Sequence, residues 1–101
     1  MKKNFDLTSP KHKPDRQVEL VKHEVNKYVA RERRKPFPAG KDVWDFDCKC
    51  GADAGSAVEV HVSEVGKEID KVAALNATSV YVEILAKAGM RNKKLKSTSE
   101  F

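Results

Sequence analysis

The chain has 101 residues, which is the length of one domain and leaves no room for a second hydrophobic core. With 40% hydrophobic and 35% charged residues it falls in the soluble globular class, and its patterning excludes a disordered chain. The start, MKKNFDLTSP, carries no apolar run after its two lysines, so we expect neither a signal peptide nor contact with a membrane. Two cysteines without an export signal favour free thiols and a cytoplasmic location.

The first part of the chain predicts a strand followed by a long helix. Residues 3–7 alternate apolar with polar side chains, as a half-buried strand does. Two prolines in TSPKHKPD then predict a loop, and the second of them, Pro14, suits the first turn of a helix. The helix should run to about Lys35, because Pro36 follows it. Its apolar stripe is Val18, Val21, Val25, Tyr28 and Val29.

The second part predicts two strands, a helix and a final strand. VWDFDCKC and VEVHV alternate with period two, and the turn-rich GADAGSA joins them. A helix beginning at Ser56 competes with the second of these strands, but it would place Val60 on the polar side. We therefore expect the helix to begin at Ser63 and to end near Asn76. TSVYVEILAKAG is the strongest strand pattern in the chain.

This order of elements predicts an α+β fold, namely a two-layer, ferredoxin-like sandwich of the form β-α-β-β-α-β. Its antiparallel sheet should have the first and third strands at the centre and both helices on one face. We expect residues 1–89 to form this single domain and the basic residues 90–101 to be a disordered C-terminal tail.

The two strands around GADAGSA also predict their own pairing. If Cys48 lies opposite Val60, then Lys49 lies opposite Glu59, which is a favourable charge pair. The same register continues with Asp47 against His61 and with Phe46 against Val62. Slipping it by two residues would instead oppose Asp47 and Glu59, and such like-charge pairs cost stability.

Cys48 and Cys50 are two residues apart on one strand face and should point into the core. Zinc sites use wider spacings, because a turn must bring both sulfurs to one ion. A disulfide at this spacing would lie near the Cα limit of about 7 Å. Buried, unreactive thiols are the favoured interpretation, and we assign no metal and no cofactor.

The uncovered face of the sheet is the first candidate site. The favoured interpretation is a solvated face of cross-strand ion pairs, with a protein-binding or self-association face as the functional alternative. Carboxylates beside an imidazole are also compatible with a metal-dependent or acid–base enzyme. The candidate residues are Asp45, Asp47, Glu59, His61, Tyr81 and Glu83.

Basic residues form the second candidate site. A run of arginines at a helix end offsets the helix dipole, which explains it without any ligand. The same charges could contact the phosphates of a nucleic acid with sequence-independent affinity. The residues are Lys27, Arg31, Arg34 and Lys35 in the first helix, and Arg91, Lys93 and Lys94 in the tail. A base-stacking sheet surface is not predicted, because the polar face offers only Tyr81 among carboxylates.

At VKHEVNKYVARERRK, WDFDCKCG, HVSEV and VYVEILAKAG the chain resembles a family of small bacterial proteins of unknown function. The resemblance covers nearly the whole chain and implies a bacterial, single-domain, cytosolic protein. It implies no activity, cofactor or catalytic residue. We therefore predict a small binding or interaction module with an unknown protein partner or self-association. A nucleic-acid-associated protein is the first alternative, and the metal-dependent or acid–base enzyme is the second.

Overall fold

The sheet has four antiparallel strands with the two longest at its centre. The computed structural model describes residues 1–89. The strands are β1 (Lys2–Asp6), β2 (Val43–Gly51), β3 (Val58–Val60) and β4 (Ser79–Gly89), and they lie in the order β1-β4-β2-β3. The helices are α1 (Pro14–Arg33) and α2 (Val65–Ala74), with a 3₁₀ turn at Val62–Glu64 immediately before α2. The predicted tail, residues 90–101, lies outside the described residues.

The predicted α+β class, the order of elements and the antiparallel sheet are confirmed. The prediction that the first and third strands are central is wrong, because β4 and β2 occupy the centre. Strand length gives the physical reason: β4 has 11 residues and β2 has 9, whereas β3 has only 3. A long strand at the edge would expose many backbone groups, so the short β3 turns outward to the edge beside β2. The sheet therefore does not have the strand order of a ferredoxin-like fold.

The ends of both helices follow their local sequence. Pro14 begins α1, Asp15 lies in its first turn and Arg31 in its last, which suits the helix dipole at each end. The helix ends at Arg33, two residues before the predicted end. After α2, Asn76 has a φ of 61°, and asparagine tolerates this left-handed conformation beyond a helix end.

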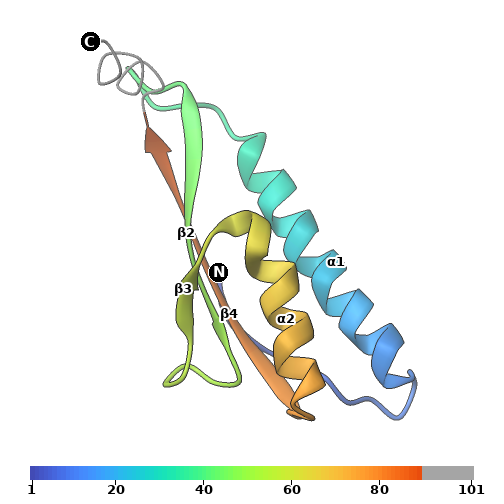
Figure 1. The fold of residues 1–101 in the computed structure, drawn as a ribbon. Helices are drawn as coiled ribbons and strands as arrows, with labels where there is room; N and C mark the ends of the chain where they lie inside the picture. Colours follow the sequence, from blue (N-terminus) through green and yellow to red (C-terminus); the bar gives the residue numbers. More distant parts are fainter. Residues whose placement is uncertain (90–101) are drawn as a thin grey trace.

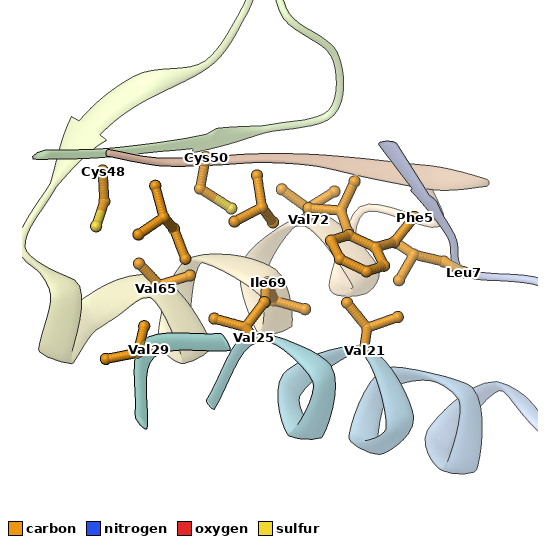
Figure 2. Close-up of a cluster of buried hydrophobic side chains, with 13 residues drawn as sticks. Phe5, Leu7, Val21, Val25, Val29, Cys48, Cys50, Val65, Ile69 and Val72 are labelled. Atoms are coloured by element: carbon orange, nitrogen blue, oxygen red, sulfur yellow. The ribbon is translucent and has the colours of Figure 1, made fainter. Parts of the chain in front are cut away.

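Both helices lie on the same side of the sheet (Figure 1). α2 packs against β2 and β4, and α1 packs along α2. An ion pair of 3.2 Å between Lys22 of α1 and Asp70 of α2 links the helices at the rim of this contact. Figure 2 shows the core between the layers, with valines of α1 and Ile69 of α2 facing side chains of the sheet. The core residues are Phe5, Leu7, Val21, Val25, Val29, Cys48, Cys50, Val65, Ile69, Val72, Val80, Val82 and Ile84.

The predicted register of the β2–β3 hairpin is confirmed where β3 exists. Cys48 lies opposite Val60, and Lys49 lies opposite Glu59. The two further predicted pairs, Asp47 with His61 and Phe46 with Val62, are wrong, because β3 ends at Val60 and the chain enters the 3₁₀ turn. On the edge of β2 that faces β3, residues before Cys48 therefore have no paired strand.

Candidate functional site

The uncovered face of the sheet carries ordered charge pairs. Lys2, Glu83, Lys49 and Glu59 lie opposite one another in a row across the four strands, with alternating sign. The Tyr81 hydroxyl donates a 2.8 Å hydrogen bond to Glu83, and this bond raises the pKa of Tyr81. Such pairs stabilise a sheet by roughly 0.2–1 kcal/mol each. Glu59, Tyr81 and Glu83 thus have a structural role in this row.

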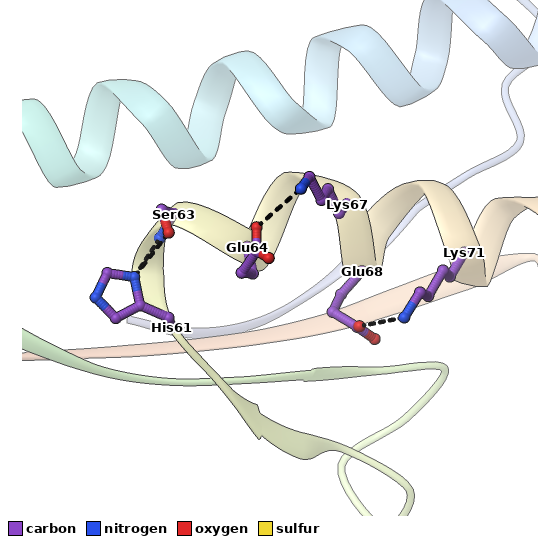
Figure 3. A network of polar contacts seen from close by, with 6 residues as sticks. All are labelled: His61, Ser63, Glu64, Lys67, Glu68 and Lys71. Atoms are coloured by element: carbon purple, nitrogen blue, oxygen red, sulfur yellow. Dashed lines mark hydrogen bonds and ion pairs between the residues drawn. The ribbon is translucent and has the colours of Figure 1, made fainter.

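His61 caps the 3₁₀ turn. Its Nδ1 accepts a 3.1 Å hydrogen bond from the Ser63 backbone N–H and lies 2.8 Å from the Ser63 hydroxyl (Figure 3). The carboxylate of Asp47, its predicted partner, instead pairs with Lys87 at 3.2 Å. Within residues 1–89, no three histidine, cysteine or acidic side chains come together in a way that could hold a metal ion.

Both cysteines are free and buried beneath α2, as the alternation of β2 predicts. Cys50 is 0% exposed, and burial raises the pKa of its thiol to about 11. Burial also raises the pKa of Cys48, with the Asp47 carboxylate as a second cause. A thiol becomes a nucleophile or metal ligand as its thiolate, so both shifts oppose such chemistry.

The Cys50 pKa leads to a stability prediction at high pH. A raised pKa in the folded state means that folding favours the protonated thiol, so its contribution is complete below the ordinary value of 9.0 and is lost as the pH rises toward about 11. We expect the difference in unfolding free energy between the native protein and Cys50→Ala to shrink over this range, as measured by urea titrations at several pH values. A difference that stays constant with pH would contradict the burial of this thiol.

The central strands continue as a two-stranded ribbon beyond the rest of the sheet. β3 pairs only with Cys48–Cys50 of β2, and β1 reaches only as far as Glu83 of β4. We call the remaining pairing, Val43–Asp47 with Leu85–Gly89, the arm. Figure 1 shows β2 and β4 running together past the end of β3. Within the described chain, no strand pairs with either outer edge of the arm.

The direction of the backbone groups in the arm follows from one hydrogen-bonded pair. The N–H and C=O of Ile84 both bond Met1, so they point toward the β1 side. Because backbone direction alternates along an antiparallel strand, the odd-numbered residues of β4 bond β2. The Gly89 carbonyl accepts a 3.0 Å bond from the Asp42 N–H and therefore faces the β2 side, as the alternation along β4 requires. The backbone N–H and C=O of Trp44 and Phe46 therefore point outward, along the edge that β3 leaves open.

A groove lies where β3 stops and this edge begins. It has a volume of about 690 Å³ and takes in polar groups of the outer face together with apolar groups of the strand edge. The lining residues are Phe46, Asp47, Cys48, Lys49, Glu59, Val60, His61, Glu83 and Leu85. Leu85 is 43% exposed and adds an apolar side chain to the charged outer face. The groove extends from the end of β3 to the beginning of the arm at Phe46, Asp47 and Leu85.

The helix-facing side chains of the arm contact the end of α1 and the segment that follows it. The Phe37 ring stacks on Trp44 with 5.5 Å between centroids, and the Trp44 Nε1–H donates a 3.1 Å bond to the Lys35 carbonyl. The guanidinium of Arg33 lies 5.3 Å from the centroid of the Phe46 ring. These contacts hold the arm in place, so its open edge is a preorganised feature.

The model of a family of unknown function, DUF6172, matches residues 1–95. The chain belongs to this family. The similarity to a small family without known function, expected from the sequence, is thereby confirmed. Searches of curated proteins and of solved structures gave no match for the DUF6172 chain. Within residues 1–89, none of its helices has the length and apolar character needed to cross a membrane.

The predicted basic site of the DUF6172 protein is only partly assembled. Lys35 forms a 2.8 Å ion pair with Glu32, and Arg31 lies over the Tyr28 ring at 6.0 Å. Lys27 is exposed and Arg34 caps the end of α1. Arg91, Lys93 and Lys94 lie outside the described residues. Pairing with a carboxylate lowers the charge that Lys35 can offer to phosphate.

The open edge itself was missed by the sequence reasoning, although a signal for it exists. VWDFDCKC is much longer than VEVHV, so a hairpin of the two must leave part of the longer strand unpaired. Periodicity does not predict the contacts of Phe37 and Arg33 with the arm, because Phe37 lies in a loop and Arg33 at a helix end.

Proposed function

We propose that this protein is an interaction module that binds an extended protein segment as an additional strand along the outer edge of β2. The observation that carries the proposal is the outward direction of the Trp44 and Phe46 backbone groups beyond the end of β3. Addition of a strand to an exposed edge is a recurrent mode of peptide recognition, in which backbone hydrogen bonds supply affinity.

The edge of the arm lacks proline and bulges, two of the features that usually protect an edge. Exposed edges are commonly blunted by proline, bulges or a covering element, and the β2–β4 register is regular from Val43 to Gly51. An added strand would form backbone hydrogen bonds with Trp44 and Phe46, each worth about 0.5–1.5 kcal/mol net. Its side chains would lie beside the groove and Leu85.

The rival functions have weaker support from the geometry. Contact with nucleic acid would use Lys27, Arg31, Arg34 and Lys35, where part of the charge is already paired. Enzyme chemistry on the outer face would use the His61 ring beside Asp47, Glu59 and Glu83, but the Nδ1 of this ring already accepts a hydrogen bond in the cap of the turn before α2. The proposed binding needs no cofactor.

The test uses the full-length protein and a displayed library of random ten-residue peptides. We expect selected peptides to slow deuterium exchange at the Trp44 and Phe46 amides. We also expect methylation of the Phe46 backbone nitrogen, introduced by chemical ligation at the Lys49–Cys50 bond, to weaken their binding by tenfold or more. This change removes one outward donor and blocks the edge, while the phenyl side chain stays intact.

The matched control is methylation of the Ala88 nitrogen, which points out of the opposite edge of the arm by the same alternation. This variant should bind as the unmodified protein does. Equal loss with both modifications, or peptides that leave the Trp44 and Phe46 amides unprotected, would show that the edge of β2 is not the binding site.

A further inference from the structure

We infer that the segment bound along β2 alternates basic with apolar residues, with lysine or arginine placed opposite Asp45 and Asp47. This inference rests on the proposed function and adds the chemistry of the partner. It follows from the two faces of the arm and from the charges that any added strand must meet.

The two faces of the arm differ sharply. Asp45 and Asp47 lie on the outer face, and both are exposed. Trp44 and Phe46 lie on the helix-facing side, where Phe37 and Arg33 contact them. Because side chains alternate along a strand, a partner in register presents one residue type to each face. Residues opposite the aspartates should be cationic, and residues beside Phe46 and Val60 should be apolar.

The position opposite Asp45 contributes most to this selectivity. Trp44 and Phe46 are the residues that would hydrogen-bond an added strand, so Asp45 between them forms a non-hydrogen-bonded pair. Side chains in such pairs come closest, with Cα atoms about 4.5 Å apart. Lys87 lies directly opposite Asp45 in the β2–β4 register, but its ammonium group pairs with Asp47 at 3.2 Å, and Asp45 makes no ion pair within residues 1–89. A cation from the partner would supply that counter-charge.

The same charges disfavour a symmetric dimer through either outer edge of the arm. An antiparallel β2–β2 contact that uses the backbones of both Trp44 and Phe46 places Asp45 opposite its own copy. The corresponding contact between two β4 edges, using Ala86 and Ala88, places Lys87 opposite its own copy. Like charges directly opposite one another destabilise a strand pair, so both symmetric dimers are opposed.

The experiment titrates the full-length protein with three synthetic peptides and follows the fluorescence of Trp44, the only tryptophan of the chain. One peptide alternates lysine with valine, one has the same composition with its lysines in a single block, and one alternates glutamate with valine. We expect the alternating basic peptide to bind at least fivefold more tightly than either of the others, and its affinity to fall as salt is added.

A charge reversal at the site provides the second arm of the experiment. Asp45→Lys should weaken binding of the basic peptide by at least fivefold and strengthen binding of the acidic one. Asp45→Asn should weaken the basic peptide without favouring the acidic one. Glu24→Lys makes the same charge change at an exposed position of α1 and should alter neither affinity. Protection of core amides from exchange confirms that each variant is folded.

The outcomes separate this inference from the proposed function. If all three peptides bind equally and lose affinity on methylation of the Phe46 nitrogen, the edge binds strands but the charge preference is wrong. If no peptide binds and the protein alone forms dimers that this methylation disrupts, a second copy is the occupant and the inference is overturned. If nothing binds and the protein remains monomeric, the proposed function fails as well.

Discussion

Ile69→Ala is expected to destabilise the protein by about 2–5 kcal/mol, the range for removing a large aliphatic side chain from a core. Ile69 is 0% exposed and belongs to the helix that packs directly against β2 and β4. Truncation would leave a cavity between the two helices and the sheet, where neighbouring side chains are already close-packed. Urea denaturation followed by circular dichroism measures the loss as a lower midpoint with an unchanged slope.

Leu75→Ala is the matched control for this substitution. Leu75 directly follows α2 and is 80% exposed, so it loses the same number of carbon atoms without creating a cavity. We expect a change within about 0.5 kcal/mol. Similar losses for both variants would contradict the packing of α2 between the sheet and α1.

Gly51→Ala is expected to lower the free energy of unfolding by about 1–3 kcal/mol, because the added methyl group would overlap with neighbouring atoms. A Cβ at this position would lie 2.7 Å from the Cα of Ala57 and 2.9 Å from its backbone nitrogen. Both contacts are with backbone atoms of the connection to β3, which cannot rotate away as a side chain can. The substitution should therefore lower the thermal midpoint and increase hydrogen exchange at the β2–β3 pairing.

Gly66→Ala should have the opposite sign. Gly66 lies in α2, and a Cβ there would meet only the end of the Lys22 side chain, at an ordinary 3.9 Å. Alanine restricts the unfolded chain and favours the helix by about 0.5–1 kcal/mol relative to glycine. A stabilising Gly51→Ala would contradict the close approach of Gly51 to Ala57. A strongly destabilising Gly66→Ala would contradict the free space beside Gly66 in α2.

Most elements of the fold could be predicted from hydrophobic periodicity, because alternating and helical patterns reflect local backbone geometry. The valine stripe of α1, the buried side of β4 from Val80 to Ile84 and the pairing of Lys49 with Glu59 all follow from spacing and charge. The order of strands did not follow, since an identical series of elements is compatible with β3 turning inward or outward. The lengths of β2 and β3 relative to each other distinguish these two arrangements. This comparison involves two separate strands, so the periodicity of either strand alone does not provide it.

Alternation predicted which side chains share the outer face, but it did not predict the open edge of β2. Alternation correctly placed Asp45 and Asp47 on the outer face, yet it extended β3 to His61, which instead caps the next turn. The backbone edge at Trp44 and Phe46 has no side-chain signature, because N–H and C=O groups are common to nearly all residues. The backbone groups of Trp44 and Phe46 are available only because no strand pairs with them within the described residues. That depends on the tertiary arrangement of the strands, which local sequence does not encode.

The central position of β4 has a consequence for the order in which the molecule assembles. β1 is the first element to be synthesised, and the only strand that it pairs with is β4, the last described element. β2 also finds its long partner there, so the ribosome must release residues 79–89 before either pairing can form. Until then the nascent chain has only helices and a three-residue hairpin contact available. Closing contacts over such sequence separations is slow, so we expect β4 to complete the sheet in one late step of folding.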